Sequence, residues 1–316
     1  MPDTPERFHP LRLGSEASLN RTCIAHVPGA DPNLVGRPAF DVLSLGALGQ
    51  ITSSSEEVAT IYGTRVAHLI ATLLAPAQRG SGTSAWRAAY LRHWMTVEQV
   101  WLGGGIVSRL GPGLLRAVRA ELGRLGVQAA SVDIAPHAQV LPLIGLARTR
   151  PAMDGRTVVI DFGHTAVKRG IASIDGGRLV QLDLLASIPA PNAEHALEFV
   201  LDCLAVTIRT AQSLHANVHE RVRVSLATYV SRGRPADPRS MYAVLGSVSR
   251  KGLQHDLQRR TRAPVRVNFV HDGTAAGRAL TDHRRAGVIM LGTALGVGFV
   301  APPSSLLPMS SDLVVG

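Results

Sequence analysis

The chain contains little cysteine. Its 316 residues include two cysteines, Cys23 and Cys203, which lie 180 positions apart and belong to no C-x-x-C pair. A disulfide framework needs several cysteines at short spacings, and a cysteine zinc site needs paired thiolates. The cysteine content therefore argues against both, and it favours a reduced, cytoplasmic protein.

Long apolar runs are also missing. No segment approaches the roughly 18 uninterrupted apolar residues needed to cross a membrane. The first residues, MPDTPERFHPLRLGSE, are polar and broken by proline, so we expect no secretory signal there. With 46% hydrophobic residues the chain can still bury one or two large cores. We therefore expect a soluble protein with no membrane partner.

Aromatic residues make up 4% of the chain, although its net charge is +10. Nucleic-acid-binding proteins usually combine basic patches with aromatic side chains that stack on bases. The arginines here are scattered singly and in pairs, which indicates a solvated surface and argues against nucleic acid as a partner. Lysine occurs only as Lys168 and Lys251, so a lysine inside a motif is less readily explained as a surface charge.

Strand-like and helix-like segments alternate along the rest of the chain. Apolar spacing predicts helices over residues 40–74, 85–95, 112–125, 194–214 and 251–261, and a short helix in LPLIGLART. Strands are predicted at 22–26, 97–102, 132–135, 157–161, 170–174, 178–184, 222–227, 265–270, 287–291 and 298–301. The three strands from 157 to 184 should form an antiparallel meander. Residues 1–38 are otherwise predicted as loop. This alternation predicts an α/β fold in two lobes.

The segment VVIDFGHTAVK is predicted to form a buried strand followed by a glycine turn. Gly163 has no Cβ, so backbone amides there can approach phosphate oxygens closely. Thr165 offers a hydroxyl and Lys168 a point charge. Asp161 at the end of the strand could hold Mg2+, through water. Taken alone, the segment is better explained by an ordinary β-hairpin turn.

The segment VNFVHDGTAAGRAL places Asp272 where a strand passes into a helix. A carboxylate at this position can face a cleft and accept a hydroxyl proton from a phosphoryl acceptor. The same residue could cap the helix, with Gly273 and Thr274 behind it. The two roles are compatible.

Two more glycine turns have uses around a nucleotide. GVIMLGTALGVGFV is a glycine hairpin in which Gly292, Thr293, Gly296 and Gly298 could admit phosphates. In VWLGGGIVSRLGPGLL, residues Gly103, Gly104 and Gly105 follow a strand and would let a flat group lie against the backbone. This second turn lacks the G-x-G-x-x-G spacing, and no acid follows about 20 residues later, which argues against a nicotinamide-dinucleotide site.

Together these four segments resemble the actin–hexokinase–chaperone ATPase (ASKHA) superfamily, and within it the ROK and hexokinase-like sugar kinases. Asp161, Gly163 and Thr165 match the family's Asp-x-Gly-x-Thr first phosphate loop, and Asp272 matches its catalytic aspartate. Gly292, Thr293, Gly296 and Gly298 match the second phosphate loop, while Gly103–Gly105 match the adenosine turn. LPLIGLA resembles the helix that closes such kinases.

The motifs occur in an unusual order. The family runs from the first phosphate loop through the catalytic aspartate and second phosphate loop to the adenosine turn and closing helix. In this chain the adenosine turn and closing helix come first, which is the same cycle cut at another point, a circular permutation. The resemblance implies two ribonuclease H-like lobes around a central nucleotide cleft. Residues 1–150 would form the first part of the adenosine-side lobe, 151–283 the first-phosphate and catalytic lobe, and 284–316 a hairpin returning to the first lobe.

The resemblance implies an ATP-dependent kinase that phosphorylates a hydroxyl of a sugar or similar small polar molecule. ATP and Mg2+ would be the cofactors, Asp272 the general base and Asp161 the residue that positions the metal. Homodimer formation is left open, and so is whether the permutation is natural or engineered.

Three departures from the family pattern leave a second functional hypothesis open. His271 replaces the usual Asn, Ala294 replaces the middle glycine of Gly-Thr-Gly, and the ROK Glu-x-Gly-His sugar motif has only the remote counterpart Glu16. The ROK zinc motif is absent, so no structural zinc is expected. The alternative is a catalytically weak nucleotide-binding regulator, or pseudokinase, of the same fold.

Overall fold

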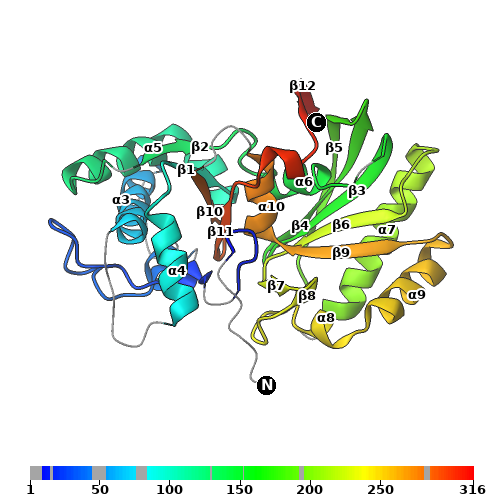
Figure 1. Cartoon of the computed structure of the whole chain (residues 1–316), viewed down its shortest axis with the longest axis horizontal. Coiled ribbons are helices and arrows are strands. Elements are labelled where there is room, and N and C mark those ends of the chain that lie inside the picture. Colours follow the sequence, from blue (N-terminus) through cyan, green and yellow to red (C-terminus); the bar gives the residue numbers. More distant parts are fainter. Residues whose placement is uncertain are drawn as a thin grey trace. The chain divides into compact units, whose positions relative to one another are not determined.

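The computed structural model describes residues 9–14, 17–44, 55–75, 84–128, 130–151, 153–191, 196–280 and 285–316 (Figure 1). It divides into two compact units, each of which is described by itself. Unit 1 comprises residues 1–141 and 282–300, and unit 2 comprises residues 142–281 and 301–316. Residues 142–150 and 301–316 thus belong to unit 2, whereas the expected ranges placed them in the adenosine-side lobe. Within the described segments, no helix is both long and apolar enough to cross a membrane.

Unit 1 is built on a four-stranded sheet with the order β11-β10-β1-β2. β1 (Gln99–Gly103) lies between β10 (Ala286–Leu291) and β2 (Ser131–Ile134) and is parallel to both. β11 (Leu295–Phe299) is antiparallel to β10 and forms a hairpin with it. The centre of this sheet therefore joins two segments, residues 99–103 and 286–291, that are far apart in the sequence.

The helices of unit 1 are α1 (Ala39–Leu43), α3 (Ser55–Leu74), α4 (Ala85–Trp94) and α5 (Gly105–Arg124), among the residues described. Helices α3 and α5 approach closely at Gly63, where an added Cβ would lie 2.9 Å from the carbonyl oxygen of Leu114. On α4, Tyr90 and Trp94 are fully buried and pack edge-to-face on Phe299 of β11. These two α4 aromatics are therefore core residues rather than part of a ligand-binding surface.

Unit 2 contains a six-stranded sheet with the order β12-β5-β4-β3-β6-β9. β3 (Gly155–Phe162), β4 (Ala166–Asp175) and β5 (Arg178–Pro189) form the expected antiparallel meander. Its second turn places Gly176 and Gly177 at positive φ, which glycine adopts without strain. β6 (Arg221–Leu226) and β9 (Arg266–His271) then add in parallel to β3, so the carboxyl ends of β3, β6 and β9 share one edge.

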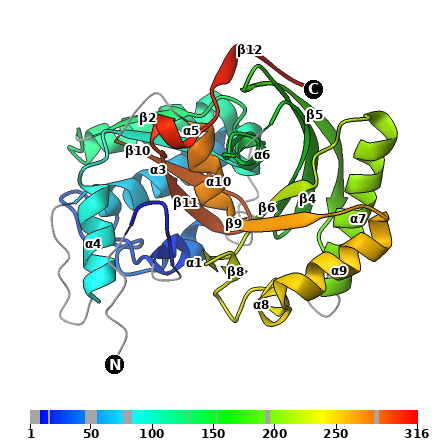
Figure 2. The ribbon, with the colours of Figure 1, turned by 45° about the vertical axis from the view of Figure 1, so that its right-hand side comes forward.

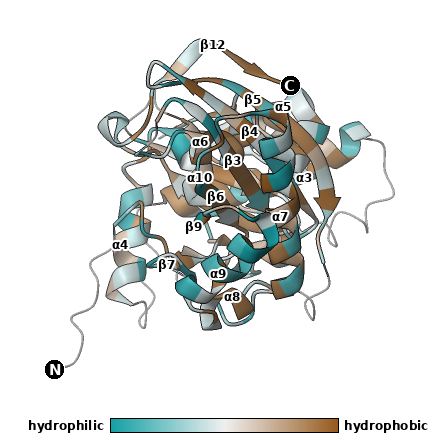
Figure 3. Ribbon diagram, turned by 90° about the vertical axis from the view of Figure 1, so that its right-hand side faces the viewer, coloured by the Kyte–Doolittle hydropathy of each residue, from teal (hydrophilic) through white to brown (hydrophobic). Residues whose placement is uncertain are grey.

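One face of the unit 2 sheet is apolar and packs on α7 (Ala196–Leu214) and α9 (Arg250–Thr261). Because side chains alternate along a strand, β3 turns Val158, Ile160 and Phe162 to this face, and all three are fully buried. Figure 3 shows the same division: β3 is largely hydrophobic and α9 is largely hydrophilic, because α9 buries only a narrow stripe. This face supplies the main core of unit 2.

The opposite face carries the alternate residues, among them Asp161, Arg223 and Ser225, and it is covered by short helices. α6 (Leu141–Ala147) and α10 (Asp272–Ala279) cross so closely that a Cβ at Gly145 would collide with the carbonyl oxygen of Ala275 (Figure 2). Arg223 donates hydrogen bonds to the last carbonyl oxygens of α6, at 3.0 and 2.8 Å. The polar face of the sheet is therefore the one that carries the candidate site residue Asp161.

Several predicted elements differ from the structure. No strand forms at residues 22–26, where only Cys23 makes an isolated bridge with Pro38, behind the short turn η2 (Leu19–Arg21). The predicted helix 40–74 is split into α1 and α3, and residues 45–54 lie outside the described part. The predicted helix 112–125 begins earlier, at Gly105, and is kinked at Gly111, where φ is +50°.

Segments predicted as loop contain further elements. SRGRPADPRS includes the small hairpin of β7 (Val230–Ser231) and β8 (Arg234–Pro235), and α8 (Val244–Ser247) follows. The proline- and serine-rich end forms η4 (Pro303–Ser305) and then β12 (Met309–Val315), which pairs in parallel with the edge strand β5. An exposed strand edge can order a segment whose composition favours loop.

Candidate functional site

A row of polar side chains crosses three strands of unit 2 near their ends. Asp161 of β3 is in register with Lys168 of β4 and with Ser225 of β6, and residues in register point to the same face. Ser225 donates a hydrogen bond to Asp161 Oδ1 at 2.7 Å, and Lys168 Nζ lies 3.9 Å from Asp161 Oδ2. Lys168 and Ser225, which come from two different strands, thus converge on the Asp161 carboxylate.

Asp161 is 5% exposed, and this burial raises its pKa. The positive charge of Lys168 and the hydrogen bond from Ser225 act in the opposite direction, while the negative charge of Asp272 raises the pKa further. Asp161 and Asp272 therefore lie within electrostatic reach of each other. A cation near Asp161 would offset the cost of burying these charges.

The turn after β3 is formed around Gly163. Its N–H donates to the carbonyl oxygen of Ala166 at 3.2 Å, and an added Cβ would lie 2.8 Å from that oxygen. The hydroxyl of the fully buried Tyr242 donates to the Gly163 carbonyl oxygen at 2.7 Å, which anchors the turn to the core. The glycine is required by the turn, and Thr165 lies on the same turn.

Asp272 is the first residue of α10 and follows directly after β9. Its Oδ1 accepts a hydrogen bond from the N–H of Gly273 at 2.6 Å and lies 3.0 Å from His271 Nε2. The capping position before the helix is taken by His271, so the suggested role of Asp272 as the N-cap residue is wrong. The Asp272 side chain keeps 22% of its surface exposed, which leaves it open to a ligand.

The pKa of Asp272 is raised, and burial is the main cause. The Gly273 amide and the charges of His164 and Lys168 partly oppose this shift. A carboxylate with a raised pKa is a stronger base and holds an accepted proton better than an ordinary aspartate. The site therefore contains a basic carboxylate, a second buried carboxylate and a lysine within one unit.

His271 is a partner of Asp272, whereas in the sequence it is distinguished only by departing from the family pattern. It is 6% exposed and stacks on Tyr229 with a ring centroid distance of 4.6 Å. Burial lowers its pKa to about 4, so the ring is neutral at pH 7. Its Nδ1 has no hydrogen-bond partner among the described residues, whereas Nε2 faces Asp272. The one feature of the sequence that pointed to His271 is its position immediately before Asp272.

The suitability of the site for Mg2+ depends on its carboxylates. Mg2+ is commonly held by one or two carboxylates together with substrate phosphates and water. Asp161 is buried, and the negative charge of Asp272 acts on it in addition to the positive charge of Lys168, so two carboxylates are available to a hydrated divalent cation. Among the described residues, no group of three or more His, Cys, Asp or Glu side chains is arranged to hold a metal without other ligands.

In unit 1, two of the predicted motifs lie side by side. Gly103 is in register with Met290, and a Cβ at Gly104 would collide with the carbonyl oxygen of Leu291, the residue before Gly292. Gly104 also has φ +100°, so packing and backbone conformation both demand glycine there. Around Gly105, in contrast, an added Cβ would meet open space. The glycine turn and the glycine hairpin are therefore packed directly against each other in unit 1.

The hairpin between β10 and β11 has a contact that the sequence did not predict. Asn20, in the N-terminal segment, accepts a hydrogen bond from the N–H of Leu295 at 2.9 Å. Gly292 and Thr293 lie in the turn itself, while Gly296 and Gly298 lie within β11, paired with β10. One amide of the predicted phosphate loop is thus already bound by a side chain.

The predicted site residues accordingly fall into two groups. Unit 2 brings together Asp161, Gly163, Thr165, Lys168 and Asp272 at the end of its sheet. Unit 1 brings together Gly103–Gly105 with Gly292 and the strand that contains Gly296 and Gly298. Glu16 lies outside the described residues.

Comparison with known proteins gives partial matches. No family model matches the chain, and neither does any curated protein. Among solved structures, a ROK hexokinase from Thermus thermophilus aligns at 18% identity over 36% of this chain and 35% of its own, with a TM-score of 0.24. The PPX-GPPA enzyme of Aquifex aeolicus aligns at 14% identity over 36% of each chain, with a TM-score of 0.22. The alignments thus span about a third of each chain, and the function must be argued from the site's own geometry.

Proposed function

We propose that this protein is an ATP-dependent phosphotransferase that phosphorylates a hydroxyl of a sugar or similar small polar molecule. The observation that carries the proposal is the position of Asp272. It is a basic, reachable carboxylate at the end of β9, beside the buried Asp161 and within electrostatic reach of Lys168. This combination suits proton abstraction next to a bound phosphate.

In the proposed reaction, Asp272 accepts the proton of the acceptor hydroxyl. That oxygen bonds to the γ-phosphorus while the bond to the leaving ADP oxygen breaks, which yields a phosphate ester and ADP. Lys168 and the amides around Gly163 and Thr165 would stabilise charge on the phosphates. Mg2+ held by Asp161 would neutralise further phosphate charge.

His271 would orient the general base. The neutral ring can donate from Nε2 to Asp272 Oδ1, which lies 3.0 Å away, and the Tyr229 stack keeps the ring in place. The Gly273 amide binds the same oxygen, so Oδ2 is the oxygen better suited to take the proton. His271 is therefore a positioning residue in this proposal.

The strand order of the two sheets supports a circularly permuted pair of ribonuclease H-like lobes. If the chain is followed cyclically from β3, unit 2 supplies an antiparallel meander and then two parallel strands, β6 and β9. Unit 1 supplies the hairpin β10–β11 and then, after the chain ends, two parallel strands, β1 and β2. We propose that Gly103–Gly105, Gly292, Thr293, Gly296 and Gly298 of unit 1 bind the adenosine and phosphates of ATP.

A second function is favoured by one specific observation. Ala294 stands where the phosphate hairpin has glycine, and the neighbouring amide of Leu295 is bound by Asn20. A hairpin with fewer free amides would hold phosphates less well, as in a nucleotide-binding regulator with little turnover. Such a protein would bind ATP without consuming it in the presence of any acceptor.

The test is a screen of ATP consumption by the purified chain over sugars and polyols, with Mg2+ present. A general base contributes about 10²–10⁴ to rate, so Asp272→Asn should reduce turnover by that factor while ATP affinity is retained. Asp256→Asn is the matched control, because Asp256 lies on α9 and pairs with the exposed Arg259. Undiminished turnover in Asp272→Asn would refute the assignment of the base, and ATP binding without turnover for any acceptor would favour the regulator.

A further inference from the structure

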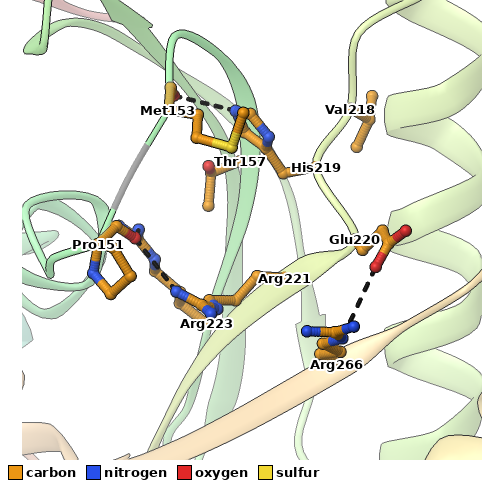
Figure 4. A pocket seen from close by; sticks show the side chains of 9 residues that line it. All are labelled: Pro151, Met153, Thr157, Val218, His219, Glu220, Arg221, Arg223 and Arg266. Carbon is orange, nitrogen blue, oxygen red and sulfur yellow. Dashed lines mark hydrogen bonds and ion pairs between the residues drawn. The ribbon is translucent and has the colours of Figure 1, made fainter.

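Unit 2 has a pocket of about 400 Å³ at the end of its sheet opposite to Asp272 (Figure 4). It is lined by residues at the beginning of β6 and β9 and by Thr157 near the beginning of β3. Asp161 lies four residues further along β3, which corresponds to about 13 Å of strand. The pocket is therefore separate from the site proposed for phosphoryl transfer.

The pocket is rich in positive charge. Arg221 and Arg223 alternate along β6, and Arg266 of β9 is in register with Arg221, so all three side chains leave the same face of the sheet. Among the described lining residues, Glu220 is the one acid, and it lies 3.7 Å from Arg266. Two of the three arginines therefore have no carboxylate partner within the described part of the chain.

Arg223 forms the fixed part of this charge. It is 4% exposed and donates to the carbonyl oxygens of Leu146, Ala147 and Pro151 at 2.8–3.0 Å. Burial and the charges of Arg221 and Arg278 lower its pKa to about 10. Like charges gathered without a counter-ion are unfavourable, and a bound anion would relieve the repulsion.

The reachable donors are Arg221 and Arg266. Arg221 is half-buried and donates to the Pro151 carbonyl oxygen at 3.3 Å, while Arg266 is exposed. A guanidinium presents several donors in a fork that matches phosphate oxygens, and two forks suit a dianion better than a carboxylate. The apolar residues Pro151, Met153 and Val218 also line the pocket and could contact the carbon part of a ligand.

We infer that this pocket binds an organic phosphate monoester through Arg221 and Arg266, with Arg223 as a fixed charge at its base. The inference does not depend on the proposed phosphotransferase activity. Its ligand belongs at the amino ends of the parallel strands, whereas the proposed ATP site belongs at their carboxyl ends.

The test is isothermal titration of the full chain with phenyl phosphate at constant ionic strength. One saturable site is expected. Loss of a charge-assisted contact should weaken binding by roughly tenfold or more in Arg221→Gln and in Arg266→Gln. Glu220→Gln should tighten binding, because it removes the competing carboxylate; a purely structural role for these residues would not produce that gain.

Two controls locate the ligand. Arg259→Gln removes an arginine as exposed as Arg266, also beside an acid, but outside the pocket, and should leave affinity unchanged. Lys168→Gln should also leave it unchanged, because Lys168 belongs to the other end of the sheet. The inference is overturned if phenyl phosphate does not bind, if Arg259→Gln weakens binding as much as the pocket variants, or if Lys168→Gln abolishes binding.

Discussion

In unit 2, strands β3, β4, β5, β6 and β9 come from one continuous stretch, residues 155–271. The sheet of unit 1 instead joins β1 and β2, within residues 99–134, to β10 and β11, within residues 286–299. In that sheet β1 pairs with β10, although the two strands are not connected by a short loop. Yet both sheets place an antiparallel hairpin beside two parallel strands. The pattern of pairing is thus preserved while the connectivity differs.

The two units depend on different interactions. In the unit 2 sheet, the pairings β3–β4 and β4–β5 join strands that follow each other directly in the sequence, and the edge strand β5 also pairs with β12 from the end of the chain. The unit 1 sheet depends on the β1–β10 pairing and on the close approach of Gly104 to Leu291 beside it. Substitutions at that junction should therefore cost more than substitutions at the corresponding turn of unit 2.

The largest expected effect is at the junction of unit 1. Gly104→Ala would place a Cβ against the Leu291 carbonyl oxygen at φ +100°, which we expect to destabilise the protein by about 3 kcal/mol or more. Gly105→Ala, in open space, should change stability by less than about 0.5 kcal/mol. Urea unfolding of both variants measures the difference. Equal stabilities would show that the junction does not hold the unit 1 sheet together.

The next effect is the pH dependence of stability caused by His271 of unit 2. The pKa of His271 is about 4, below its ordinary value of about 6.5, so between these pH values the unfolded chain binds a proton that the folded chain does not. Stability should therefore fall by up to about 3 kcal/mol as the pH falls across this window. The raised pKa values of Asp161 and Asp272 act in the opposite direction, because the folded carboxyl groups take up protons first.

Replacing His271 isolates its share of this pH dependence. His271→Asn should lose less stability than the natural chain between pH 6.5 and 4, measured by urea unfolding at several pH values. His255→Asn, on the exposed side of α9, serves as the control and should follow the natural chain. If all three proteins lose stability in parallel, His271 is not held neutral by its surroundings.

A smaller loss of stability is expected from a substitution in the turn of unit 2 that corresponds to the hairpin of unit 1. Gly163→Ala would bring a Cβ to 2.8 Å from the Ala166 carbonyl oxygen, and we expect a cost of about 1–2 kcal/mol. Thermal unfolding, compared with Gly104→Ala, gives the ranking directly. A larger loss for Gly163→Ala would reverse the comparison between the two units.

The smallest expected effect tests the hydrogen bond between Asn20 and Leu295. Asn20→Ala removes the acceptor of the Leu295 amide, at a cost of about 1 kcal/mol to stability. If this amide belongs to the phosphate hairpin, ATP affinity should rise in the same variant, as measured by titration. Unchanged ATP affinity would indicate that Leu295 takes no part in nucleotide binding.

Much of the secondary structure could be predicted because it depends on local chemistry. Helix α4 and strand β9 lie within a residue or two of their predicted ranges, and the Asp175-Gly176-Gly177 turn joins the expected strands. The mixed α/β class followed from the alternation of these elements. The strand predicted at 22–26 was wrong, because its apolar residues pack into unit 1 without pairing in a sheet.

The candidate site was predictable in its residue types but not in its environment. Asp161 and Asp272 were identified because each carboxylate follows a buried strand. The role of His271 could not be predicted from the sequence, because the neutral state of its ring depends on burial against Tyr229 and on the distance to Asp272. Asn20 escaped notice for the same reason: its partner lies 275 residues away.

By itself the sequence determined the local elements, the polar residues at strand ends and the glycines at tight turns, because apolar period and backbone sterics act over a few residues. Only the tertiary structure decided that β1 pairs with β10, that the tail becomes β12 beside β5, and that Arg221 and Arg266 meet at one pocket. These outcomes depend on which distant segments bury each other's surfaces, and that information is spread over the whole chain.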